Sequence, residues 1–464
     1  MADGVRELSA INFIELCGVY STYGALMFYL LNYLNLSLEN TYAFYGLFFS
    51  LKFLCPVLMA PLIDRYIGAW WSLVLGMLMM AAGFFLLING NIKFCMFGLS
   101  VYGVGWGAFK NSLPVLNKRL AQTEMQGQRG VALVQLTGCF GMLTPGLYSY
   151  IFGMESLRNL FVSLGMLFVI SIVLFAYKTW RLRERVSKLN VNVFHATYYV
   201  VATLALIYLL FLYDLIVICI SVLVLYICVL MSHIYRDSNR VQKKNTVKVG
   251  AIILYVLIAS ILFNQIQVIQ IFLSMHVVGH SIIPFSASSY ITAKPFLAIL
   301  YGASIYITRK KQAISVKTLT YASIIYITTP FMMILSISVI PLEPHVLPSL
   351  FVLVAMPLLG LAVFLLDTFF VYSLPRLAPA KHQARFMSLY YFTYVISGYI
   401  SRSLSVNFAT AGSNSFVGLG VYKNYFFIML LISASLIVVW QVVQKIVFKN
   451  DESVFETHDP VVVS

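Results

Sequence analysis

Charged residues are scarce in this sequence of 464 residues. Asp, Glu, Lys and Arg make up 10% of the chain, hydrophobic residues make up 61%, and the mean hydropathy is +0.88. A soluble globular domain carries about 25% charged residues, so this composition excludes an ordinary soluble protein. It is typical of a chain that lies in a lipid bilayer.

Residue patterns that support enzyme or metal chemistry are also missing. The six cysteines show no C-x-x-C spacing, which argues against a metal site. The sequence has no acidic metal cluster, no Ser/His/Asp set and no phosphate-binding loop. We therefore expect no metal, no cofactor and no enzymatic activity.

Long apolar runs are what the sequence has in abundance. Each run holds about 20 residues, enough for a helix to cross roughly 30 Å of hydrocarbon. Strands have no place in such a pattern, so we predict an all-α polytopic membrane protein. Fourteen spans are expected, at residues 11–34, 43–63, 70–88, 94–116, 131–153, 160–177, 195–212, 215–233, 249–273, 284–308, 319–340, 346–374, 384–408 and 422–447.

The loops between these spans carry basic residues very unevenly. If the N-terminus lies in the cytoplasm, the outer segments hold only Lys93, Arg158 and Lys423, and nearly all other loop Lys and Arg lie inside. This distribution predicts that both termini are cytoplasmic. It also accounts for the formal net charge of +15 without nucleic acid, because anionic lipid meets the inner loops.

Six charged residues fall inside the predicted spans, at least four residues from either end. Such residues normally face a partner or a watery cavity on a transport path, although those near a helix end can reach the interface. Arg402 suits the interface, whereas Lys52 lies near the middle of its span and is either functional or merely paired. The six residues are Glu15, Lys52, Lys110, Lys294, Asp367 and Arg402.

Three of these charges lie at a similar depth. At 1.5 Å per residue, Glu15 is about 6 Å, Lys110 about 9 Å and Asp367 about 10 Å from the cytoplasmic surface. Opposite charges at one depth predict an ion cluster, with chance placement as the alternative. Gly103 and Gly107 lie one turn apart on the Lys110 face and predict the close approach of another helix.

Several motifs together resemble the proton-dependent oligopeptide transporters of the major facilitator superfamily. "IELCGVYSTYG" is similar to the first-helix signature E-x-x-E-R-F-x-Y-Y-G, with Glu15 and Tyr23 at matching positions. "GVGWGAFK" is similar to the family's G-x-G-x-x-x-x-K, which ends in the substrate-site lysine, here Lys110. "PLIDRYIGAWWSLVLG" resembles the D-R-x-x-G loop, at Asp64, Arg65 and Gly68. "LFNQIQVIQIF", "AKPFLAILYG" and "LPRLAPAKHQARFMSLYYFTYVISGY" resemble stretches of the later helices.

The resemblance implies two six-helix bundles, and bacterial members carry two extra helices between them. We accordingly assign residues 1–178 to the N-terminal bundle, 179–245 to basic linkers and the extra hairpin, 246–449 to the C-terminal bundle and 450–464 to a disordered tail. A bacterial inner-membrane location follows from the same resemblance, as does a monomer.

The departures from the family pattern bear on function. Gly18 and Val19 stand at the second glutamate and the arginine of E-x-x-E-R, and Leu26 and Asn264 replace both partners of an outer ion pair. The tenth-helix glutamate that engages a peptide's amino end falls at Val363. Lys294 replaces the asparagine before a proline.

These features predict a secondary transporter of di- or tripeptides, or of a related carboxylate-bearing solute, driven by the proton gradient. The alternative is a facilitator or a carrier of another small anionic solute, with altered or absent proton coupling. A membrane enzyme or receptor is the least favoured interpretation. The resemblance and the charge balance assign substrate binding to Lys110, Tyr23, Lys294, Asn264 and Lys52, and proton coupling and gating to Glu15, Lys110 and Asp367.

Overall fold

The computed structural model describes residues 4–121, 123–144, 157–186, 193–213, 215–237, 239–264, 293–308, 316–341, 347–411 and 417–445. Within these ranges the chain forms fourteen α-helices and no strand. The helices are α1 (Val5–Phe28), α2 (Leu38–Pro61), α3 (Gly68–Leu87), α4 (Ile92–Leu120), α5 (Glu124–Gly141), α7 (Leu157–Val186), α8 (Val193–Tyr213), α9 (Ile216–Asp237), α10 (Arg240–Phe263), α13 (Phe296–Thr308), α14 (Val316–Val339), α15 (Leu347–Leu377), α16 (Gln383–Ala411) and α17 (Val417–Val443).

Each predicted span overlaps one of these helices, which confirms the all-α fold class. Ten of the described helical segments are long and apolar enough to cross a membrane. The outer parts of the expected spans 131–153, 249–273 and 284–308 lie partly outside the described residues. Two π-helical turns, η1 (Tyr29–Tyr33) and η2 (Leu62–Tyr66), follow α1 and α2, and a 3₁₀ turn, η4 (Ala380–His382), precedes α16.

Polar residues at the helix starts explain where several helices begin. The side chain of Asn91 accepts a hydrogen bond from the Lys93 N–H at the start of α4. Asn239 and Gln242 form a reciprocal capping box at the start of α10. Such side chains satisfy backbone N–H groups that have no partner inside the helix.

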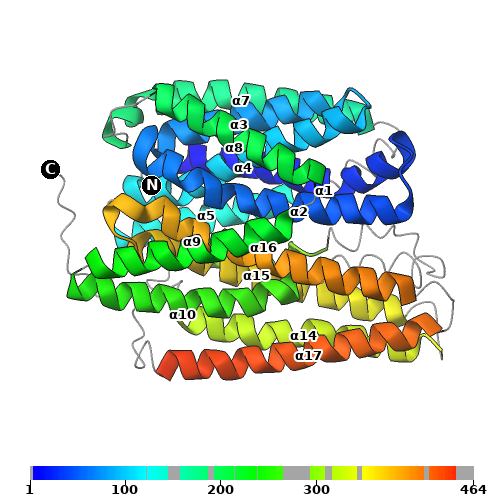
Figure 1. The fold of residues 1–464 in the computed structure, drawn as a ribbon. Coiled ribbons are helices and arrows are strands. Elements are labelled where there is room, and N and C mark those ends of the chain that lie inside the picture. The colour runs from blue at the N-terminus through cyan, green and yellow to red at the C-terminus, as the bar shows by residue number, and fades with distance from the viewer. Residues whose placement is uncertain are drawn as a thin grey trace.

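The helices run along one common direction, as Figure 1 shows. The early helices, coloured blue to cyan, gather in the upper part of the view, and the late helices α14, α15 and α17 lie below them. Helix α3 packs against α4 and α7, and α1 packs against α5. In the later part, α14 packs against α15 and α17, and α10 packs against α16 and α17.

Contacts between the early and late helices run mainly through two pairs, α2 with α16 and α5 with α13. Helix α8 of the extra hairpin contacts α2 and α4, while α9 contacts α10 and α2. The hairpin therefore touches both the early helices and the start of the late ones. The packing of α1, α2 and α4 buries Glu15 and Lys52.

Candidate functional site

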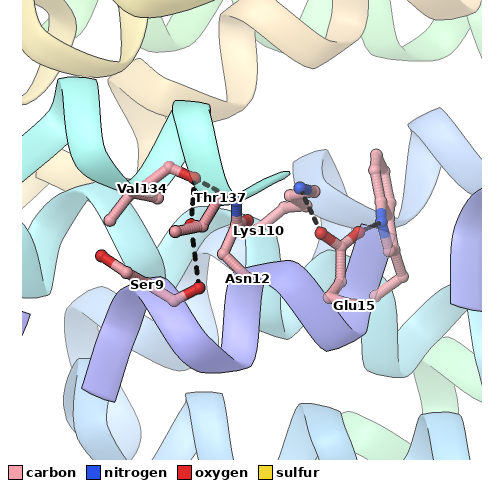
Figure 2. Close-up of polar contacts among 7 residues, drawn as sticks. Ser9, Asn12, Glu15, Lys110, Val134 and Thr137 are labelled. Carbon is pink, nitrogen blue, oxygen red and sulfur yellow. Dashed lines mark hydrogen bonds and ion pairs between the residues drawn. The ribbon is translucent and has the colours of Figure 1, made fainter. Parts of the chain in front are cut away.

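A buried ion pair joins α1 to α4. The Lys110 Nζ lies 2.6 Å from Glu15 Oε2, and the indole N–H of Trp106 donates to Glu15 Oε1 at 2.6 Å. The Glu15 side chain is 0% exposed, and the Lys110 side chain is 14% exposed. Figure 2 shows the carboxylate between the two donors. The ion pair expected from the depth comparison is present, and both donors come from one face of α4.

The part of α1 that precedes Glu15 is fixed to α5 by hydrogen bonds. Asn12 donates from Nδ2 to the Val134 carbonyl at 2.7 Å, and the hydroxyl of Thr137 donates to the Ser9 carbonyl at 3.0 Å. Figure 2 shows these contacts one and two turns away from Glu15. Because α1 is anchored to α5 directly before Glu15, the Glu15 carboxylate is held in a defined position.

Lys52 of α2 belongs to the same group of residues. Its Nζ lies 4.1 Å from the centroid of the Trp106 ring and 5.3 Å from that of Phe53, close enough for cation–π attraction. Trp106 thus has the Lys52 ammonium over its ring and the Glu15 carboxylate at its N–H. The sequence places Lys52 and Trp106 on different helices, and only the packing of α2 against α4 brings them together.

Gly107 makes this close packing possible. A Cβ at Gly107 would lie 2.5 Å from the backbone carbon of Cys55, and one at Gly103 would lie 3.2 Å from Cys55 Sγ. A side chain at Gly107 would therefore push α2 away from α4. The close helix approach predicted from these two glycines is confirmed.

Asp367 of α15 is engaged by α16. The Tyr390 hydroxyl donates to Asp367 Oδ1, and the hydroxyls of Tyr390 and Tyr394 are 3.0 Å apart. Asp367 also lies within electrostatic reach of Lys110 and Lys294. The carboxylate thus has an aromatic hydroxyl as its direct partner and two lysines nearby, so the three charges of the predicted cluster lie in one region.

Lys294 is a buried lysine of the segment that precedes α13. Its side chain is 2% exposed, and no described residue accepts a hydrogen bond from Nζ. The ammonium lies 4.4 Å from the centroid of the Phe263 ring and 5.8 Å from that of Tyr20. Burying a charged donor without an acceptor is costly, so Lys294 is a position at which an anionic ligand would be stabilised.

The other two predicted binding residues are Asn264 and Tyr23. Asn264, at the end of α10, donates from Nδ2 to the Ser397 hydroxyl at 2.8 Å. Tyr23 lies in α1, but its side chain is outside the described part of the structure. The described contacts therefore join Glu15, Lys110 and Lys52 around Trp106, and link Asn264 to α16 instead.

The position of the second signature glutamate is filled by packing. A Cβ at Gly18 would lie 2.8 Å from Cε2 of Phe168 and 3.3 Å from Cζ of Phe84. The neighbouring Val19 and the more distant Leu26 are both buried among apolar side chains. Aromatic rings from α7 and α3 occupy the space next to α1, which leaves no room there for a carboxylate.

A second set of polar contacts closes one end of the bundle, which we call the Asp64 end. The Asp64 carboxylate, in η2, accepts hydrogen bonds from the backbone N–H groups of Ala384 and Arg385, both at 3.1 Å. Lys118 of α4 donates to the Pro375 carbonyl at 2.8 Å. These bonds tie η2 and α4 to α15 and α16, across the boundary between the early and late helices.

The D-R-x-x-G motif is used at this end in two ways. Asp64 meets the start of α16, where unpaired N–H groups and the helix dipole favour a negative charge. Gly68 adopts φ 75°, a left-handed conformation that suits glycine, and starts α3. Arg65 is exposed.

The site also contains three residues that the sequence did not single out, namely Trp106, Tyr390 and Tyr372. Trp106 is one turn before Lys110 on α4, so helical spacing placed it on the same face. The Tyr372 hydroxyl donates to Glu124 Oε1 at 3.1 Å and adds to the Asp64 end. Aromatic residues are so frequent in this chain that nothing singled out Tyr372 or Tyr390 beforehand.

Among the described residues, no group of three His, Cys, Asp or Glu side chains could hold a metal ion.

Comparison with known proteins adds a family and a fold. The profile of the family described as Major Facilitator Superfamily matches residues 8–402. A structure reported under "Structural insights into substrate recognition in proton dependent oligopeptide transporters" is 14% identical, with a TM-score of 0.73 over 96% of this chain and 99% of that chain.

Two more solved structures share the fold. A POT family transporter in complex with a thioalcohol conjugated peptide is 16% identical, with a TM-score of 0.71 over 97% of this chain and 96% of that one. A POT family transporter in complex with 5-aminolevulinic acid is 15% identical, with a TM-score of 0.67 over 96% of this chain and 95% of that one. With its apolar helices and the profile match over most of its length, the chain belongs to the Major Facilitator Superfamily and is a multi-pass membrane transporter rather than an enzyme.

Proposed function

We propose that this protein is a proton-coupled secondary transporter of a small carboxylate-bearing solute, of which di- and tripeptides are the first candidates. Two bundles, residues 1–178 and 246–449, move against each other to expose the site to either side in turn. The observation that carries the proposal is the buried pair of Glu15 and Lys110, with Lys52 and Asp367 beside it. Buried charges of this kind are expensive in a membrane and mark transport paths.

Proton binding and substrate binding are coupled because the Glu15 carboxylate and the substrate carboxylate compete for Lys110. While Glu15 is ionised, it holds the Lys110 ammonium at 2.6 Å. A proton on Glu15 removes that attraction and frees Lys110 to bind a substrate carboxylate. Loss of the substrate lets Lys110 return, and the returning ammonium favours release of the proton from Glu15. Asp367 is a second acid that a nearby lysine can influence in the same way.

The charge balance favours an anionic group on the substrate. Among the described residues of this region, the three lysines Lys52, Lys110 and Lys294 outnumber the two acids Glu15 and Asp367, and no described residue accepts a hydrogen bond from the Lys294 ammonium. Val363 stands where the family's glutamate binds a peptide's amino end, and it is buried. The transporter with a similar fold in complex with 5-aminolevulinic acid supports testing carboxylates other than peptides.

A facilitator that carries a small anion without protons is the alternative. The observation that favours it is the packing at Gly18, where Phe168 fills the place of a signature carboxylate. The two functions differ in one property, because a facilitator only equilibrates its solute, whereas a symporter accumulates it.

Purified protein in liposomes tests the proposal. We expect labelled dialanine or 5-aminolevulinic acid to accumulate when an inward proton gradient is imposed, and accumulation to cease when an ionophore removes the gradient. Lys110→Ala should reduce accumulation to the protein-free level. Lys93→Ala is the matched control, because Lys93 is an exposed lysine on the same helix.

The outcomes separate the alternatives. Equal uptake with and without the gradient would support the facilitator, and full accumulation by Lys110→Ala would refute the assigned role of the ion pair. We also propose that the protein is a monomer in a bacterial inner membrane, with both termini in the cytoplasm.

A further inference from the structure

The extra hairpin makes one specific hydrogen bond to the early helices. The hydroxyl of Tyr199, near the start of α8, donates to the Leu58 carbonyl of α2 at 2.5 Å. The ring of Tyr66, in η2, lies 5.7 Å from the Tyr199 ring and is stacked 6.4 Å from the His195 ring. Two residues of α8 therefore hold the last turn of α2 and the π turn that follows it.

The Leu58 carbonyl is available because α2 changes its hydrogen bonding there. In a regular α-helix it would accept from the N–H of Leu62, four residues on. That N–H donates to the Met59 carbonyl instead, and the N–H of Ile67 donates to the Leu62 carbonyl at 3.1 Å, a π-type bond. The Tyr199 hydroxyl thus takes the place of the ordinary intrahelical donor.

The π turn sets the direction of Asp64. Asp64 is the third residue of η2, and its carboxylate binds the Ala384 and Arg385 N–H groups of α16. Tyr66, whose ring lies against Tyr199 and His195, is two residues after Asp64 in the same turn. A shift of this turn relative to α8 would therefore also move Asp64 relative to α16.

We propose that Tyr199 is a positioning residue for the closed Asp64 end. Its hydroxyl binds the Leu58 carbonyl and its ring lies against Tyr66, so α8 fixes the turn from which Asp64 reaches α16. The hairpin therefore stabilises the contact between the early and late helices. This role does not depend on the identity of the transported solute.

Thiol labelling measures this closure without a substrate. Ala384 is fully buried at the contact, and its backbone N–H, not its side chain, binds Asp64. In an Ala384→Cys protein, the rate at which a water-soluble maleimide labels position 384, followed by peptide mass spectrometry, reports opening of the Asp64 end. Mass spectrometry separates this position from the native cysteines, which can stay in place.

We expect Tyr199→Phe to raise the labelling rate roughly 2- to 10-fold, as loss of one hydrogen bond shifts the equilibrium by that factor. Asp64→Asn should also raise the labelling rate, and it serves as the positive control. Tyr198→Phe is the matched negative control, because Tyr198 is the adjacent residue on α8 and is 73% exposed. Tyr66→Leu, which removes the ring between His195 and Tyr199, should act like Tyr199→Phe.

A merely structural anchor would behave differently. If Tyr199 only attaches the hairpin, Tyr199→Phe lowers the melting temperature but leaves labelling at position 384 at the parent rate. That result would overturn the proposal, provided that Asp64→Asn labels faster. Equal acceleration by Tyr198→Phe would also overturn it, because the effect would then be general loosening of α8.

Discussion

Trp106 donates its indole N–H to Glu15 Oε1 at 2.6 Å, so the buried carboxylate is bound by two donors from adjacent turns of α4. Trp106→Phe keeps an aromatic ring near Lys52, but it removes the N–H and makes the ring smaller. A hydrogen bond to a charged group contributes about 1.5–3 kcal/mol. We therefore expect a lower melting temperature in detergent and slower uptake in liposomes. Trp180→Phe, at a half-exposed tryptophan of α7, is the control. If the melting temperature and the uptake rate of Trp106→Phe equalled those of the parent, Lys110 alone would hold the carboxylate.

Because Glu15 and Lys110 form an ion pair, we expect single and double substitutions to differ in their effect on stability. Glu15→Gln or Lys110→Met leaves one buried charge without its partner, at a cost of about 3–5 kcal/mol, whereas removing both charges can be nearly neutral. The Glu15→Gln, Lys110→Met protein should thus melt near the parent temperature and still fail to transport. Thermal unfolding and gradient-driven uptake of the four proteins test this. Additive loss of stability in the double variant would mean that the two side chains do not act as a pair.

Gly107 offers a prediction about helix spacing. In Gly107→Ala, the new methyl group would lie 2.5 Å from the Cys55 backbone, which cannot yield as a flexible side chain can. Overpacking of this kind costs about 1–3 kcal/mol or more, and it should separate Lys52 from Trp106. Gly420→Ala is the control, since a Cβ there meets nothing within 4 Å. The melting temperature should fall for Gly107→Ala and stay the same or rise for Gly420→Ala. A lower melting temperature for Gly420→Ala than for Gly107→Ala would contradict the close contact of α2 and α4.

His382 makes the stability of the Asp64 end depend on pH. Burial, followed by the positive charges of Arg385 and Arg65, lowers the pKa of His382 below its ordinary value of 6.5. The unfolded chain therefore binds the proton more readily, and stability should fall as the pH drops below about 6.5, until the folded state also takes up the proton. Melting temperatures between pH 8 and pH 5 should decline less for His382→Gln than for the parent. If the melting temperature declined equally with pH in both proteins, protonation of His382 would not oppose folding.

Membrane orientation can be measured directly. The excess of basic residues in the inner loops predicts cytoplasmic termini. A reporter enzyme that is active only outside the cytoplasm should give no signal when it is fused at Lys449, whereas a cytoplasmic reporter at the same position should be active. A signal from the external reporter would reverse the topology, and it would place the Asp64 end on the outer side.

The sequence predicted the helices well because hydropathy depends on the chain alone. Every expected span matches a helix, and the Glu15–Lys110 pair followed from a comparison of depths along α1 and α4. The rotation of each helix about its axis was not predictable in the same way, because it depends on packing against neighbours. Trp106 and Tyr390 gained their roles only once α2, α4, α15 and α16 were in contact. The π turn before α3 was equally hidden, since no residue type specifies it.

The contact of Gly18 with Phe168 restricts how this sequence can change. A single substitution of Gly18 to Glu would drive the new side chain into a ring that already lies 2.8 Å from the Cβ position. Shrinking Phe168 first would leave a cavity, and replacing a buried Phe by Ala costs about 3–5 kcal/mol. Either order of the two steps passes through a less stable protein. Gly18 and Phe168 thus constrain each other, so a carboxylate at position 18 requires a rearrangement of α7 as well as a substitution in α1.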